Sequence, residues 1–390
     1  MFASRTNWKR DTNPLSLLKK KLEDQGVPVL DLTESNPTHC EFAYLNGMLL
    51  RAFADPRNFS YEPSPHGLEG TRQAISSYYQ EKGIRVSPKQ IFLTASTSEA
   101  YSFIFRLLCN PGDHVLVPRP SYPLFDFLGD INDVILDPYR LSYEGTWKID
   151  ALLLQKTVGP ETKAILFVNP NNPTSSFVKQ DELASILPIA KEKDLAFIAD
   201  EVFSNFALSP ARQRVKSFAE IPEVLTFTLE GISKTLGLPQ MKLAWIVLNG
   251  PPALVKEATA RLEIICDTYL SVSTPVQYAL PIWLAEQKEI HKEISGRLIK
   301  NLNLLKKTLE AFPMVTLLEP EAGWYAVLRI PRVQSEEAWC LEILAKDHIL
   351  VHPGFFFDFE EEAYLVVSLL PPAAVFQEGL QRLLTRIKMK

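Results

Sequence analysis

The segment Gly231-Ile232-Ser233-Lys234-Thr235-Leu236-Gly237-Leu238-Pro239 places a lysine shortly after an apolar stretch of the chain. Two more polar segments follow apolar stretches in the same way: Asn169-Pro170-Asn171-Asn172-Pro173-Thr174 and Asp200-Glu201-Val202-Phe203. Short apolar runs of this kind are typical of parallel strands buried on both faces. Because ligands of open α/β sheets bind beyond the carboxyl ends of the strands, these segments predict one shared site. The three apolar stretches cover residues 164–168, 195–199 and 224–229.

The rest of the chain predicts a wound, mostly parallel α/β sheet and a second, smaller unit. Between residues 90 and 250, short apolar runs alternate with helical segments, which is the pattern of a sheet covered by helices. After residue 280 the pattern changes to a long charged helix and a strand, which indicates a separate α+β unit. The expected strands are 91–95, 114–117, 134–136 and 323–330, and the expected helices are 99–108, 179–194 and 287–311.

Size and composition narrow the function classes. At about 150 residues per domain, the 390 residues suggest two or three domains. A net charge of −5 without a basic stripe argues against nucleic acid as a partner. Residues 1–10 hold no continuous apolar segment for a signal peptide, and no later segment reaches membrane-spanning length, so we expect a cytoplasmic protein without membrane contact. The four cysteines and six histidines lack metal-ligand spacing, so no metal site is expected.

Together, the three polar segments resemble the core signature of fold-type I pyridoxal 5'-phosphate (PLP) enzymes, in the class I/II aminotransferase superfamily. The resemblance extends from about residue 30 to the C-terminus. It implies PLP as the cofactor, a large PLP-binding domain at residues 46–279, and a small discontinuous domain made of residues 1–45 and 280–390 that closes over the site.

The resemblance assigns the central roles to three residues. Lys234 forms the Schiff base with PLP and later moves a proton between Cα and the cofactor carbon, as general base and acid. Asp200 matches the aspartate that pairs with the pyridine nitrogen and keeps it protonated. Asn172 matches the donor to the phenolic oxygen of the ring. Without the resemblance, Asp200 reads as a helix cap after a strand and Asn172 as part of a plain turn.

The phosphate of PLP needs donors at a helix N-terminus and a cation. Ser96, Thr97 and Ser98 directly precede the expected helix 99–108, although ordinary N-capping would explain them too. Lys242 follows Lys234 by eight residues, where the family usually has an arginine, and supplies the charge without the guanidinium fork. Ser233, directly before Lys234, is the remaining expected contact at this end of the cofactor.

Three further positions are assigned by the resemblance. Tyr122 matches the aromatic residue that stacks on the pyridine face. Tyr61 resembles the tyrosine that reaches the phosphate in the neighbouring subunit, so we expect a homodimer. Taken alone, either tyrosine reads as a packed surface aromatic. His352, next to Pro353 and Gly354, lies in a loop that the family places near the substrate.

The chain departs from the family pattern at three positions. Phe203 stands where a tyrosine commonly donates to the phenolic oxygen, so one donor is missing while Phe203 still faces the expected cofactor. Gly231 replaces a serine. Val366 occupies the place of the arginine that clamps the substrate α-carboxylate, which predicts an atypical substrate or another cation.

These observations predict a PLP-dependent aminotransferase that moves an amino group from an amino donor to a keto acid or aldehyde acceptor. A PLP-dependent β-elimination lyase of the carbon–sulfur type would use the same cofactor residues and remains an alternative. A non-catalytic binding module on the same fold is a third possibility, which the presence of both Lys234 and Asp200 disfavours. The identities of donor and acceptor do not follow from these motifs.

Overall fold

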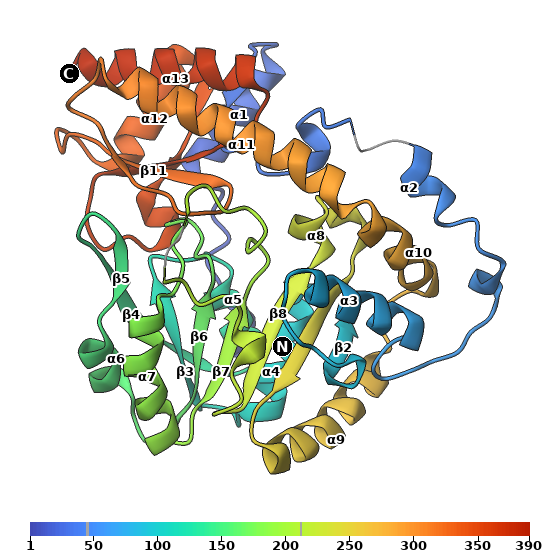
Figure 1. The fold of residues 1–390 in the computed structure, drawn as a ribbon. Coiled ribbons are helices and arrows are strands. Elements are labelled where there is room, and N and C mark those ends of the chain that lie inside the picture. Colours follow the sequence, from blue (N-terminus) through green and yellow to red (C-terminus); the bar gives the residue numbers. More distant parts are fainter. Residues whose placement is uncertain (44–46, 211–212) are drawn as a thin grey trace.

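The computed structural model describes residues 1–43, 47–210 and 213–390, and its centre is an eight-stranded sheet (Figure 1). The strand order is β2-β9-β8-β7-β6-β3-β4-β5. The five strands from β8 to β4 run parallel, whereas β2, β9 and β5 pair antiparallel with their neighbours. The strands are β2 (Ile91–Thr94), β3 (His114–Arg119), β4 (Ile135–Tyr143), β5 (Trp147–Ile149), β6 (Thr162–Val168), β7 (Ala196–Asp200), β8 (Thr226–Gly231) and β9 (Ala244–Asn249).

The predicted wound, mostly parallel sheet is confirmed, and the apolar runs form its centre. Strands β6, β7 and β8 are buried at almost every position, because helices cover both faces of the sheet. Strand β4 continues seven residues beyond the predicted end at 136. This part escaped prediction because its burial largely alternates and its last three residues pair with the short antiparallel β5, which we did not expect.

Two helical layers enclose the sheet. One layer contains α3 (Glu69–Glu81), α6 (Ala151–Thr157) and α7 (Gln180–Glu192), whose buried residues join the larger core cluster. The other contains α4 (Thr97–Leu108), α5 (Phe125–Ile131) and α9 (Pro252–Tyr269), which pack on the opposite face. Helices α4 and α7 confirm the predicted helices 99–108 and 179–194, with ends that differ by two residues or fewer.

The C-terminal residues build a second unit above the sheet in Figure 1. Its antiparallel sheet has the order β10-β11-β14-β13. The N-terminal segment belongs beside this unit, since β1 pairs parallel with β12, with Leu30 opposite Ile349. The elements are α1 (Pro14–Asp24), β1 (Leu30–Asp31), α11 (Gln287–Leu309), β10 (Thr316–Leu318), β11 (Tyr325–Arg329), α12 (Glu336–Asp347), β12 (Ile349–Leu350), β13 (His352–Pro353), β14 (Tyr364–Ser368) and α13 (Ala373–Lys388).

The division into two domains stays a prediction. Its first boundary, between residues 45 and 46, lies outside the described residues, and its second, between 279 and 280, falls within α10 (Thr274–Ala285). The remaining helices are α2 (Gly47–Arg51), α8 (Ile232–Thr235) and short 3-10 turns at Ser4–Thr6, Pro37–His39, Pro56–Phe59, Pro88–Gln90, Phe218–Glu220, Pro239–Met241 and Gly354–Phe357. In the described ranges, none of the helices combines the length and apolar character that crossing a bilayer requires.

Candidate active site

A cavity of about 290 Å³ opens at the carboxyl ends of β6, β7 and β8. Polar residues at the ends of neighbouring parallel strands meet there, as expected for an open α/β sheet. Of the predicted cofactor residues, all except Tyr61 line this cavity. The predicted residues in its wall are Ser96, Thr97, Ser98, Tyr122, Asn172, Asp200, Phe203, Ser233, Lys234 and Lys242.

Lys234 lies in α8, the four-residue helix that directly follows β8. Its amine is 4.9 Å from the ring centroid of Trp324 and 5.6 Å from that of Phe203, so two aromatic rings lie beside it. Burial lowers the pKa of Lys234 to about 8, and the carboxylate of Asp200 opposes this shift. About a tenth of the amine is therefore neutral at pH 7, far more than for an ordinary lysine, and the neutral amine is the form that a nucleophile or general base requires.

Asp200 is the last residue of β7 and is 8% exposed. Its Oδ2 accepts a hydrogen bond of 2.9 Å from the hydroxyl of Tyr101, and its Oδ1 accepts one of 3.1 Å from the backbone N–H of Val202. Burial raises the pKa of Asp200 to about 6, while these two donors oppose the shift. The carboxylate is thus held in one orientation at the cavity wall.

Asn172 belongs to the loop after β6 and lines the cavity with a buried side chain. Its Oδ1 has no hydrogen-bond partner within the described ranges. The neighbouring Asn171 secures the loop, since its Nδ2 donates to the carbonyl of Pro120 at 2.9 Å and its Oδ1 accepts from Ser121 at 3.1 Å. These two bonds join the loop to the segment that carries Tyr122.

The N-terminus of α4 forms another wall of the cavity. Ser96 is the N-cap, and its Oγ accepts from the backbone N–H of Glu99 at 3.1 Å, so the capping interpretation applies to this residue. Thr97 and Ser98 face the same space. Lys242 also lines the cavity, has a left-handed backbone with φ of 52°, and forms no ion pair with the described residues.

Two aromatic side chains complete the predicted set. Tyr122 is 37% exposed and packs edge-on against Phe125, with ring centroids 5.9 Å apart. Burial of part of the ring raises the pKa of Tyr122 to about 12. Phe203 is buried and packs edge-on against Trp324, at 5.4 Å, and Tyr325, at 6.3 Å.

The departures from the family pattern lie in well-defined surroundings. A Cβ atom at Gly231 would lie 2.8 Å from the Cβ of Ala244 on β9, so the strand pairing leaves no room for the serine found in the family. Val366 is 1% exposed, in register with Val327 and His352 in the small sheet, and does not line the cavity. His352 does not line it either.

Tyr61 is the predicted cofactor residue that stands apart. Tyr61 is 76% exposed and lines a different hollow together with Glu62, Cys266 and Ser271.

Sequence reasoning missed several residues of the cavity wall. Tyr101 lies one helical turn after Thr97, on the face of α4 that meets Asp200, so helical periodicity within the predicted helix could have indicated it. Ser35 and Tyr325 also line the cavity, but they come from the N-terminal segment and from β11. No local pattern connects such distant segments to the strand ends.

The comparisons with known proteins agree with this geometry. Residues 28–387 match the family model for aminotransferase class I and II. The glutamate-pyruvate aminotransferase AlaA of Haemophilus influenzae is 27% identical over 371 residues, which are 93% of this chain and 91% of that protein. The alanine aminotransferase of Mycobacterium tuberculosis is 25% identical over 372 residues, which are 93% of this chain and 86% of that protein.

Solved structures show the same fold. An alanine aminotransferase from Pyrococcus furiosus superposes with a TM-score of 0.91 at 24% identity and covers both chains completely. An aminotransferase from Escherichia coli superposes with a TM-score of 0.88 at 26% identity and covers 100% of this chain and 98% of that one. PLP is the general cofactor of such enzymes. The chain therefore belongs to the aminotransferase class I and II family and is an aminotransferase with the fold-type I architecture.

Proposed function

We propose that this aminotransferase works with PLP held covalently by Lys234, and that Asp200 sets the charge of the cofactor ring. The observation that carries the proposal is the meeting of Lys234, Asp200 and Asn172 in one cavity at the ends of β8, β7 and β6. A lysine amine, a buried carboxylate and an amide are the groups that a carbonyl-bearing pyridine ring requires.

Unsatisfied polar atoms support the fit of this cofactor. Asn172 Oδ1 is buried without a partner, and its Nδ2, the donor that the proposed contact with the ring requires, makes no side-chain hydrogen bond within the described ranges, so the amide group is available to a ligand. Three further polar groups line the cavity where the phosphate is expected: the hydroxyls of Thr97 and Ser98 and the ammonium of Lys242. Within the described ranges, none of the three is engaged in a side-chain hydrogen bond or an ion pair. A dianion beside the N-terminus of α4 would use these groups.

Each side chain of the cavity then has its own role in the reaction. Bound PLP would supply an electron-withdrawing ring next to the substrate carbon. Lys234, with a pKa of about 8, takes up and returns the proton at Cα of the substrate. Asp200 presents a carboxylate to the ring nitrogen, in an orientation fixed by the hydroxyl of Tyr101. The small unit contributes Tyr325 and Ser35 to the wall of the cavity.

A homodimer is part of the proposal. Tyr61 is largely exposed and outside the cavity of its own chain, so its proposed contact with a cofactor phosphate requires a second subunit. A cytoplasmic location likewise remains our prediction from the sequence.

The substrates are an amino donor and a keto acid acceptor, and we propose that their carboxylates are not bound by the arginine usual in the family. Val366 lies in the core of the small sheet, and the cations that line the cavity, within the described ranges, are Lys234 and Lys242. Both have proposed roles toward the cofactor. The names of the relatives point to alanine, glutamate and their keto acids as the first compounds to assay.

The test begins with purified protein and PLP. Reduction with borohydride followed by peptide mapping should place the cofactor on Lys234. Incubation with amino donors should convert bound PLP to its pyridoxamine form, followed by absorbance. Labelling of a different lysine would refute the assignment, and ammonia release without a keto acceptor would favour the lyase alternative.

A further inference from the structure

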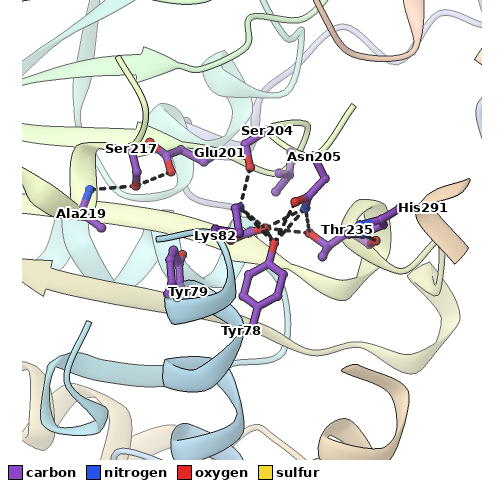
Figure 2. A network of polar contacts seen from close by, with 12 residues as sticks. Tyr78, Tyr79, Lys82, Glu201, Ser204, Asn205, Ser217, Ala219, Thr235 and His291 are labelled. Atoms are coloured by element: carbon purple, nitrogen blue, oxygen red, sulfur yellow. Dashed lines mark hydrogen bonds and ion pairs between the residues drawn. The ribbon is translucent and has the colours of Figure 1, made fainter. Parts of the chain in front are cut away.

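A buried polar network lies behind α8, on the α3 face of the sheet (Figure 2). Its centre is Glu230, which is completely buried near the end of β8. The oxygen Oε1 of Glu230 accepts hydrogen bonds from the hydroxyl of Tyr78 on α3, from Asn205 Nδ2 at 3.1 Å, and from Thr235 Oγ1 at 3.0 Å. One carboxylate oxygen therefore joins three segments that are distant in sequence.

The ammonium group of Lys82 accompanies this carboxylate. Lys82 Nζ lies 3.7 Å from Glu230 Oε1 and donates to the hydroxyl of Tyr78 at 3.1 Å and to Ser204 Oγ at 3.2 Å. Burial of a carboxylate is costly unless charge pairing and hydrogen bonds offset it. The second oxygen, Glu230 Oε2, is buried without a partner within the described ranges, so the described donors all converge on Oε1.

Thr235 is held from two sides by this network and by α11. Its hydroxyl donates to Glu230, and its carbonyl accepts a hydrogen bond of 2.7 Å from His291 Nε2. Burial lowers the pKa of His291, which favours the neutral ring that donates one hydrogen bond. Helix α8 has four residues and no side-chain cap, and so short a helix has little stability of its own. Tertiary contacts must therefore fix its orientation.

We propose that Glu230 is a positioning residue that orients Lys234 toward the cavity through Thr235, the residue next to it. The same oxygen holds Asn205, in the turns that follow Asp200. One carboxylate thus fixes the two strand ends that carry the amine and the carboxylate of the active site. This inference rests on the proposed function, since it assumes that Lys234 is the residue that captures PLP.

The decisive variant is Thr235→Val, which removes the link to α8 and leaves the other bonds of Glu230 in place. Glu230→Gln changes the whole network at once and could fail to fold, so Thr235→Val is the primary variant. Thr235→Ser keeps the hydroxyl and should restore the wild-type behaviour. Thr228→Val is the matched control, because Thr228 is completely buried two residues before Glu230 on β8 and its Oγ1 has no partner within the described ranges.

Two ligands separate positioning from general damage. The rate at which the apoprotein captures PLP, trapped with borohydride, should fall roughly ten- to hundredfold in Thr235→Val, which is the effect of losing one hydrogen bond to a charged group. Pyridoxamine 5'-phosphate cannot condense with a lysine, so its affinity should be unchanged. Thr235→Ser and Thr228→Val should match the wild type in both measurements.

Two results would overturn the inference. Capture of PLP by Thr235→Val at the rate of Thr228→Val would show that the link to Glu230 does not position Lys234. A parallel loss of affinity for pyridoxamine 5'-phosphate would show a merely structural role. Failure of the proposed function would look different, because borohydride would then label another lysine in the wild-type protein itself.

Discussion

Replacing Tyr101 by phenylalanine should destabilise the apoprotein more at pH 8 than at pH 5. Burial raises the pKa of Asp200 to about 6 in the folded protein, so the folded state binds this proton more tightly than the unfolded chain. The resulting stabilisation is fully present below the unfolded pKa of about 4 and is lost as pH rises through 6. By pH 8 the loss amounts to about 3 kcal/mol.

The hydroxyl of Tyr101 reduces that loss. A hydrogen bond contributes about 1.5–3 kcal/mol when its acceptor is charged and about 0.5–1.5 kcal/mol when both partners are neutral. Tyr101→Phe should therefore destabilise the ionised form of Asp200 by about 1 kcal/mol more than the protonated form. This difference raises the pKa of Asp200 by about one unit, to about 7. The phenylalanine ring keeps the edge-on contact with Phe125, whose centroid is 5.4 Å away.

The assay is urea unfolding of the apoprotein at several pH values from 5 to 8, with each variant compared to the wild type at the same pH. Tyr101→Phe should cost about 1 kcal/mol more at pH 8 than at pH 5. Tyr139→Phe is the matched control, since its buried hydroxyl donates at 2.8 Å to the carbonyl of Leu166, which does not titrate. A cost for Tyr101→Phe as independent of pH as that of the control would refute the reasoning.

Two further substitutions and one comparison of substrates test the site. Lys234→Ala should abolish both the borohydride-fixed cofactor and amino transfer, measured by mass spectrometry and by keto acid formation, whereas retained labelling would contradict the assignment of this lysine. Phe203→Tyr adds a hydrogen-bond donor at the cavity wall, so the pKa of the lysine–cofactor linkage should fall by roughly one unit in a spectrophotometric titration. An unchanged pKa would mean that residue 203 does not contact the ring. With Val366 in place of the arginine clamp, kcat/KM for glutamate, aspartate and alanine should fall roughly 30-fold to several thousand-fold below that of a substrate whose carboxylate is absent or placed elsewhere. Efficient turnover of ordinary α-amino acids, with no replacement cation at the carboxylate in a crystal complex, would contradict this last expectation.

Much of the fold was predictable because local patterns and sheet geometry agree. Each polar segment follows a short, mainly apolar run, and such runs become buried parallel strands whose carboxyl ends share one edge. That relation was enough to bring Lys234, Asp200 and Asn172 to one cavity. Their chemical roles rest on the resemblance and stay predictions until the experiments above are done.

The remainder of the site depends on contacts without a local signal. Tyr325 reaches the cavity wall from β11, and Ser35 from the segment after β1, so both depend on how the small unit packs on the large sheet. The sequence alone does not explain why residue 231 is a glycine and not the serine of the family. In the structure, a Cβ atom at this position would lie 2.8 Å from the Cβ of Ala244 on β9. Strand β9 itself runs antiparallel to β8, a pairing that the apolar runs do not reveal.

The alternation of side chains along β7 and β8 explains why charged side chains lie on both faces of the sheet at the ends of these strands. Successive residues of a strand point to opposite faces. Asp200 therefore faces the cavity, while Glu201 faces the α3 side and accepts hydrogen bonds of 2.7 Å from both Ser217 Oγ and the backbone N–H of Phe218. Burial raises the pKa of Glu201 to about 7, and the charge of Glu230 on the same side adds to this rise. Glu201 and Glu230 thus lie on the α3 side of the two strands whose ends carry Asp200 and Lys234. Substitutions on this side should therefore change the activity by shifting Lys234 and Asp200, without contacting a ligand.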